Sequence, residues 1–244
     1  MQPVTARESA LAFVDGLKAS GGTNIHDALA TALRGGAGDR TGDRPHTVVF
    51  VTDGLPTVGP VDVETIVAGA RTAAGASGGA GPLRVFDPNV RPRLLPDAAA
   101  VAALRDLVEE FFATADLVKL SSADAEVLYE GASAAAAADR IRRLGARSVV
   151  VTCGAKGAYV AAADGASMLP APVVRAVDAT GAGDSVMGAL VRRLLADGVP
   201  VDLAGWQRNV RFALAVAGLV CERPGGAVAM PTEDEVTARW GPLE

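Results

Sequence analysis

The sequence predicts an α/β fold in which a mainly parallel sheet lies between two layers of helices. Short runs of apolar, often β-branched residues alternate with segments of helical spacing along the chain. The runs VVFV and VVVT are apolar throughout, which is typical of strands buried on both faces. Strands separated by helices form βαβ units, and their helices cover both faces of the sheet. We therefore expect a three-layer αβα, doubly wound (Rossmann-like) architecture.

The composition limits the classes of function. The 244 residues are 50% hydrophobic and 21% charged, which fits a packed globular core, and the length allows one large or two small domains. The formal net charge is −5 and only 4% of residues are aromatic. Because there is no basic run, we expect no nucleic-acid partner.

The cysteines and the apolar runs indicate a cytoplasmic protein without a membrane partner. Cys153 and Cys221 both lack a CxxC partner, so neither a disulfide framework nor a zinc cluster is expected. The start, MQPVTARES, lacks the apolar segment of a signal peptide. The longest late apolar run, 212–221, is too short to span a bilayer.

In the first third of the chain, helical spacing predicts helices at 7–18, 25–34 and 62–75. The segment HTVVFVTDG, 46–54, is apolar and bounded by turn residues, which predicts a buried strand. The small residues of AAGASGGAGP, 73–82, predict a loop.

The rest of the chain continues the alternation of strands and helices. Strands are expected at 83–87, 116–120 and 148–152, a short β pair at 157–169, and helices near 97–113, 123–130, 132–144 and 203–221. A further helix is expected to begin within the motif VDATGAGDSVMGAL, 177–190.

This motif places permissive backbone and a carboxylate at the start of a helix. The first N–H groups of a helix lack partners and carry partial positive charge, and Gly181 to Gly183 allow an anion to approach them. Asp184 would repel a phosphate at this point unless it acts as a general base toward a hydroxyl that attacks the phosphate. Alternatively, the glycines form a tight turn and Asp184 caps the helix.

The motif and four further segments resemble, in order, the ribokinase/PfkB family of carbohydrate kinases over about 84–235. The four segments are FDPNVRPRL at 86–94, ADLVKLSSADAEVLY at 115–129, VVVTCGAKGAYV at 149–160 and RFALAVAGLVCERPGGAVAMPT at 211–232. The resemblance implies a ribokinase-like fold for this part of the chain. It also implies phosphoryl transfer from ATP to a hydroxyl of a small-molecule sugar or sugar acid.

The same resemblance implies roles for individual residues. Asp184 would be the catalytic base, and the N–H groups of Gly181, Ala182 and Gly183 would form an anion hole. Arg91, together with Asn89, would contact substrate and phosphates, although an arginine in such a loop can also form a surface ion pair. The residues implied in nucleotide binding are Ser121, Asp124, Thr152, Gly154, Lys156 and Gly157.

Cations are also implied by the family. Ser121 and Asp124 match a polar pair near Mg²⁺ and the phosphates, whereas the alternative for Asp124 is a charge at a helix N-terminus. Asp178 and Thr180, with carbonyls near 223–226, match a site for a monovalent cation such as K⁺. The implied cofactors are thus ATP, Mg²⁺ and K⁺.

The segment at about 7–80 resembles the middle of a von Willebrand factor A domain. SGGTNIHDALATAL followed by HTVVFVTDGLPTVG carries the likeness. In that family Thr23 and Asp53 would contribute oxygen ligands to a metal-dependent adhesion site. The DxSxS loop of that site does not occur in the chain. The alternatives are a helix cap at Thr23 and a turn residue at Asp53.

These resemblances predict two incomplete segments, a von Willebrand-like one at 1–82 and a kinase-like one at 83–244, joined near 76–86. Our hypothesis is one continuous hybrid sheet spliced at the strand 83–87. The sugar-binding elements of the kinase family are not recognisable in the first 80 residues. Alternatives to a carbohydrate kinase are therefore a nucleotide- or cation-binding module, or a non-catalytic recombined fragment. The sequence leaves the sugar and the oligomeric state open.

Overall fold

The computed structural model describes residues 24–35, 57–75 and 83–241, which belong to two units divided between Leu83 and Arg84. Each unit is described by itself. The expected helix at 7–18 and strand at 46–54 lie outside the described residues. The hypothesis of a hybrid sheet therefore stays a prediction.

The first unit contains two of the predicted helices, α2 (Ile25–Gly35) and α3 (Val63–Gly75). Ala30 of α2 and Ala73 of α3 are buried against each other, with the partly buried Ala70 beside them. A Cβ on Gly69 would lie 2.4 Å from the ring of His26, so the glycine permits the close approach of the two helices.

The second unit contains one five-stranded sheet in the order β1-β2-β3-β4-β5. β1, β2 and β3 are parallel to one another, whereas β3–β4 and β4–β5 are antiparallel. The strands are β1 (Val85–Phe86), β2 (Leu117–Ser121), β3 (Val149–Thr152), β4 (Ala158–Ala162) and β5 (Gly165–Leu169). The parallel strands and the β pair expected at 157–169 are thus confirmed.

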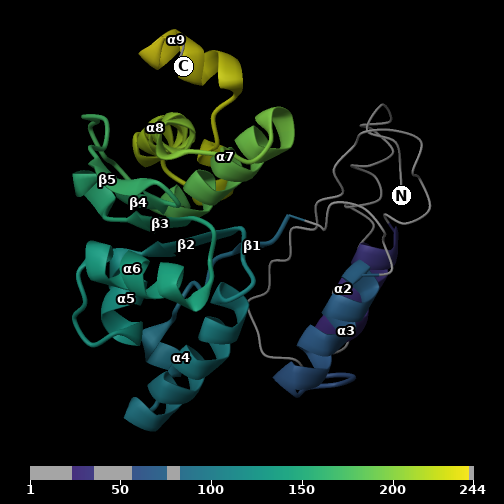
Figure 1. Cartoon of the computed structure of the whole chain (residues 1–244). Helices are drawn as coiled ribbons and strands as arrows, with labels where there is room; N and C mark the ends of the chain where they lie inside the picture. The colour runs from purple at the N-terminus through teal and green to yellow at the C-terminus, as the bar shows by residue number, and fades with distance from the viewer. Residues whose placement is uncertain (1–23, 36–56, 76–82, 242–244) are drawn as a thin grey trace. The chain divides into compact units, whose positions relative to one another are not determined.

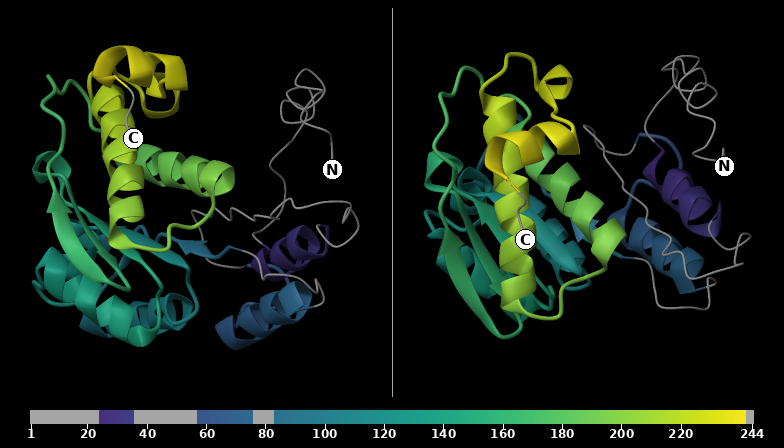
Figure 2. Two further views of the ribbon diagram at one scale, coloured as in Figure 1. Left: turned by 45° about the horizontal axis from the view of Figure 1, so that its top comes forward. Right: turned by 90° about the horizontal axis from the view of Figure 1, so that it is seen from above.

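Helices cover both faces of this sheet (Figures 1 and 2). One layer contains α4 (Ala98–Phe112), α5 (Ser122–Leu128) and α6 (Ala134–Leu144), and the other contains α7 (Ala182–Asp197) and α8 (Leu203–Cys221). This arrangement confirms the predicted three-layer αβα fold. A last helix, α9 (Glu233–Trp240), was not predicted, although Thr232 and Glu235 form a capping box at its start.

β1 is shorter than the predicted strand at 83–87. Pro88 has no N–H to donate to a neighbouring strand, which limits the strand at its end. At its beginning, the N–H of Arg84 donates to the carboxylate of Asp116 at 2.8 Å instead of to a strand. The pairing is therefore restricted to two residues opposite β2.

Alternating side chains of β2 face different layers. Val118 and Leu120 are fully buried in the core with α4, α5 and α6, together with Phe112 and Ile141. Since successive side chains of a strand point to opposite faces, Lys119 faces the layer of α7 and α8. None of the helices in the described segments is both long and apolar enough to cross a membrane.

Candidate active site

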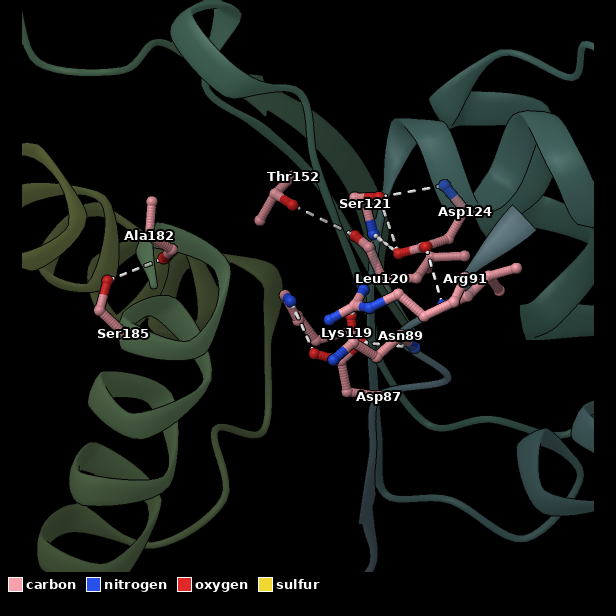
Figure 3. Close-up of polar contacts among 11 residues, drawn as sticks. Asp87, Asn89, Arg91, Lys119, Leu120, Ser121, Asp124, Thr152, Ala182 and Ser185 are labelled. Atoms are coloured by element: carbon pink, nitrogen blue, oxygen red, sulfur yellow. Dashed lines mark hydrogen bonds and ion pairs between the residues drawn. The ribbon is translucent and has the colours of Figure 1, made fainter. Parts of the chain in front are cut away.

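The carboxyl ends of three parallel strands meet at one edge of the sheet, where α/β proteins commonly bind ligands. Ser121 at the end of β2 pairs with Thr152 at the end of β3. Asp87 directly follows β1. Figure 3 shows the side chains of Asp87, Asn89 and Lys119 gathered close together. Most of the residues predicted to act on nucleotide and substrate belong to these strand ends and to the start of α7.

The start of α7 has the geometry of an anion site. Gly181 has a φ of 78° and directly precedes the helix, and a Cβ there would lie 3.0 Å from the Cα of Gly226. Within the described part of the chain, no acceptor faces the N–H of Gly183 or Asp184. The N–H of Ala182 instead donates to the carbonyl of Ala179 at 3.1 Å. Of the three predicted donors, those of Gly181 and Gly183 therefore have no acceptor among the described residues, as does the N–H of Asp184, whereas that of Ala182 is occupied.

The carboxylate of Asp184 lies exposed in the first turn of α7. The next residue, Ser185, is buried and donates its hydroxyl to the carbonyl of Ala182 at 2.7 Å (Figure 3). This bond helps to fix the turn. Asp184 thus lies on a turn fixed by this bond, with its side chain exposed.

An ion pair that the sequence analysis missed lies beside this turn. The ammonium Nζ of Lys119 donates to Oδ2 of Asp87 at 2.6 Å, and the two side chains are 5% and 17% exposed. Burial raises the pKa of Asp87, against the opposing effect of Lys119. A Cβ on Gly183 would lie 3.2 Å from the Nζ of Lys119. The signal in the sequence was a single lysine within the apolar strand LVKL.

Asp124 is buried, and its carboxylate accepts several donors. Oδ2 accepts the N–H of Ser121 at 2.8 Å and its hydroxyl at 2.7 Å, while the hydroxyl accepts the N–H of Asp124. Oδ1 accepts the N–H of Val90 at 3.0 Å. The pair Ser121–Asp124 therefore forms the capping box of α5 and anchors the loop after β1. This geometry favours a positioning role for Asp124, while its predicted contact with nucleotide stays a prediction.

The loop anchored by Asp124 carries Asn89 and Arg91, both exposed. Asn89 has a φ of 42°, and its N–H donates to the carboxylate of Asp87 at 3.3 Å. The guanidinium of Arg91 donates to the side-chain oxygen of Asn89. Arg91 therefore lies on the same loop as the ion pair at β1, and no carboxylate partner is recorded for it among the described residues.

The predicted nucleotide loop follows β3. The hydroxyl of Thr152 donates to the carbonyl of Leu120 at 3.4 Å and so links β3 to β2. Gly154 and Lys156 lie exposed in a single 3₁₀ turn, and the N–H of Gly157 closes it at 2.9 Å from the carbonyl of Gly154. Lys156 is thus exposed to solvent, and its predicted contact with nucleotide stays a prediction.

Asp178 links the loop before α7 to the loop after α8. One carboxylate oxygen accepts the N–H of Thr180 at 2.9 Å, and the other accepts the N–H of Gly225 at 3.1 Å. Hydrogen bonds from the side chain and backbone of Thr180, followed by that from Gly225, lower the pKa of Asp178. The structure thus brings together the residues that were predicted to hold a monovalent cation.

The predicted adhesion-type metal residues Thr23 and Asp53 lie outside the described residues, so that site stays a prediction. The alternative role of Thr23 as a helix cap likewise stays a prediction, and the first described residue before α2 is Asn24. The side-chain oxygen of Asn24 accepts the N–H of Asp27 at 3.1 Å and serves as the cap.

Comparisons with known proteins agree with this arrangement. The sequence matches the pfkB family of carbohydrate kinases over residues 47–233. It is 34% identical over 155 residues to a fructokinase of Klebsiella pneumoniae, covering 62% of this chain and 48% of the relative. It is 33% identical over 152 residues to a 2-dehydro-3-deoxygluconokinase of Thermoproteus tenax, covering 62% of this chain and 44% of the relative. The chain therefore spans about half the length of the curated relatives that it matches.

A similar solved structure is the fructokinase of Vibrio cholerae bound to fructose, ADP and a calcium ion. It is 27% identical, has a TM-score of 0.61 and covers 71% of this chain and 55% of its own. A double mutant of the same enzyme has been solved with fructose, ADP and a potassium ion. The family match begins within the segment that resembles a von Willebrand domain, and that second resemblance stays a prediction. With its match over 47–233 and its ribokinase-like fold, the chain belongs to the pfkB family of carbohydrate kinases.

Proposed function

We propose that the chain provides the nucleotide-binding and phosphoryl-transfer part of an ATP-dependent sugar or sugar-acid kinase. The observation that carries this proposal is the start of α7. There, the free N–H groups of Gly183 and Asp184 adjoin the exposed carboxylate of Asp184. Membership of the pfkB family and the position at the carboxyl edge of the sheet support the same function.

In this function, Asp184 accepts the proton of the substrate hydroxyl as its oxygen attacks the terminal phosphorus of ATP. The bond between that phosphorus and the leaving oxygen of ADP breaks as the new bond forms. The N–H groups of Gly183 and Asp184 stabilise the charge on the transferred group. Arg91 offers a planar pair of donors for phosphate oxygens from the loop after β1.

The cations have separate roles in this proposal. Mg²⁺ is usually held by one or two carboxylates and substrate phosphates, so it would enter with ATP and balance the phosphate charge. Asp178 retains lone pairs beyond the two N–H donors that it accepts, which fits a monovalent cation beside the start of α7. Potassium in the related fructokinase mutant is consistent with such a site.

The substrate class follows from the relatives. One relative acts on fructose and another on the sugar acid 2-dehydro-3-deoxygluconate, according to their names. We therefore propose a six-carbon sugar or sugar acid with a primary hydroxyl as the phosphoryl acceptor.

Calorimetry of ATP binding in the presence of Mg²⁺ and K⁺ tests the proposal with two variants. Gly183→Asp places a carboxylate where the phosphate should bind, so this variant should lose saturable ATP binding. Asp184→Ala should retain ATP binding because it removes only the base. Transfer to fructose and to 2-dehydro-3-deoxygluconate, followed through ADP release, should fall by at least about 100-fold in Asp184→Ala.

The possible outcomes separate the alternatives. ATP binding without transfer to either acceptor would indicate a nucleotide-binding module rather than an enzyme. The absence of ATP binding by the folded wild-type protein would overturn the proposal altogether. Equal ATP binding by the wild type and Gly183→Asp would show that the start of α7 is not the phosphate site.

A further inference from the structure

Lys119 brings a buried positive charge to the first turn of α7. Its side chain is 5% exposed and faces the layer of α7 and α8, opposite the core side chains Val118 and Leu120. The 3.2 Å between its Nζ and the Cβ position of Gly183 places the ammonium against the helix turn that carries Asp184. The ammonium of Lys119 therefore lies beside the free N–H groups of Gly183 and Asp184.

The hydrogen-bonding capacity of Lys119 is not filled by the described residues alone. Asp87 is the single acceptor recorded for the ammonium of Lys119 in the described ranges, although an ammonium has three N–H donors. The helix N-terminus adds partial positive charge beside it. Asp87 balances the charge of the ammonium but accepts only one of its donors, and the helix terminus beside it favours a bound anion. The arrangement is thus suited to a ligand with more than one negative oxygen.

We propose that Lys119 contacts the terminal phosphoryl group of the bound nucleotide from the side of the sheet. On the opposite side, the N–H groups of Gly183 and Asp184 would hold the same group. This inference rests on the proposed function and adds to it a residue that touches the transferred group. The hydroxyl proton still goes to Asp184, and the ammonium of Lys119 stabilises the charge that develops during transfer.

Asp87 positions the ammonium in this proposal. Its carboxylate fixes one of the three donors of Lys119 at 2.6 Å, which leaves the others free to turn toward the phosphate. A purely structural role is the competing explanation, in which the ion pair only ties the end of β1 to β2. That explanation predicts that loss of Lys119 and loss of Asp87 change nucleotide affinity by the same factor. Contact of Lys119 with the phosphoryl group instead predicts that loss of Lys119 weakens nucleotide binding more than loss of Asp87 does.

Calorimetry with two nucleotides distinguishes the explanations. The wild type, Lys119→Met and Asp87→Asn are titrated with a non-hydrolysable ATP analogue and with ADP, both in the presence of Mg²⁺. Lys119→Met should weaken binding of the ATP analogue by about 10- to 100-fold, as expected for loss of a charged hydrogen bond. Its affinity for ADP should change by less than about threefold, because ADP lacks the terminal group. Asp87→Asn should weaken binding of the ATP analogue by a smaller factor than Lys119→Met does, because the ammonium remains but is no longer fixed in place.

Two further variants control for general effects of substitution and for misfolding. Arg147→Met removes a partner of Asp116 at the opposite end of the strands and should bind both nucleotides as the wild type does. If Lys119→Met does not fold, Lys119→Gln keeps a donor for Asp87 without the charge and should show the same selective loss. An equal effect of the Lys119 variants on ATP analogue and ADP would overturn this inference alone. A folded wild type that binds neither nucleotide would overturn the proposed function.

Discussion

Gly154 and Gly157 delimit the turn after β3 and both have positive φ angles, 56° and 103°. Their surroundings differ. A Cβ on Gly157 would lie 1.9 Å from the carbonyl oxygen of Leu169 and 2.6 Å from the N of Ala171, which are backbone atoms that cannot turn aside. A Cβ on Gly154 would meet no atom within 4 Å. Substitution of Gly157, whose φ and ψ are 103° and −135°, thus combines a larger backbone penalty with crowding that Gly154 lacks.

Alanine substitutions should reveal this difference. Gly154→Ala should lower the free energy of unfolding by about 1 kcal/mol, the effect of a left-handed backbone angle alone. Gly157→Ala should lower it by at least about 3 kcal/mol, because the strand backbone of β5 must also move. Urea unfolding of the two variants measures both effects. Equal losses would contradict the tight packing of Gly157 against the end of β5.

The loop before α7 and the end of α8 are connected through backbone groups as well as through Asp178. The N–H groups of Val177 and Asp178 both donate to the carbonyl of Cys221, at 2.7 and 3.2 Å. The carboxylate of Asp178 then accepts the N–H of Gly225 in the following loop. The position of the α7 start, and with it the candidate anion site, therefore depends on how α8 ends.

This connection should make stability depend on pH in a defined direction. Because the pKa of Asp178 is lower in the folded protein than its ordinary value of 3.8, its ionised form contributes stability above about pH 4. That contribution is lost as the pH falls through the folded pKa. The stability difference between the wild type and Asp178→Asn should therefore shrink below about pH 4 in urea unfolding. A constant difference from neutral to acid pH would contradict the assignment.

The helices and strands of the second unit could be predicted because their signals are local. For example, the helix at 203–221 has apolar residues on all sides and an N-cap, Asp202, that accepts the N–H of Gly205 at 2.8 Å. The role of Lys119 could not be predicted, because it depends on strand pairing and on a helix more than 60 residues later. For Asp124, the capping box with Ser121 is local, whereas its bond to the N–H of the distant Val90 could not be predicted.

The candidate site was therefore predicted as a set of motifs but not as a network of contacts. The residues of GAGD were found from their sequence, whereas the bond that occupies the N–H of Ala182 follows from the conformation of the preceding turn. Periodicity also gave no boundary between the two units. LRVF at 83–86 fitted a strand in either segment, while the pairing of Val85 and Phe86 with β2 assigns these two residues to the second unit.

Limited proteolysis tests whether that second unit is independent in the whole molecule. All five described strands and the helices on both faces lie after Leu83, and the N–H groups of Asp116 and Leu117 donate to the carbonyl of Arg84. An elastase-type protease should cleave among the small residues at 73–82 and release a stable C-terminal fragment, identified by mass spectrometry. The fragment should keep a cooperative unfolding transition. Resistance at 73–82, or a fragment that unfolds on release, would instead favour one continuous sheet spliced at β1.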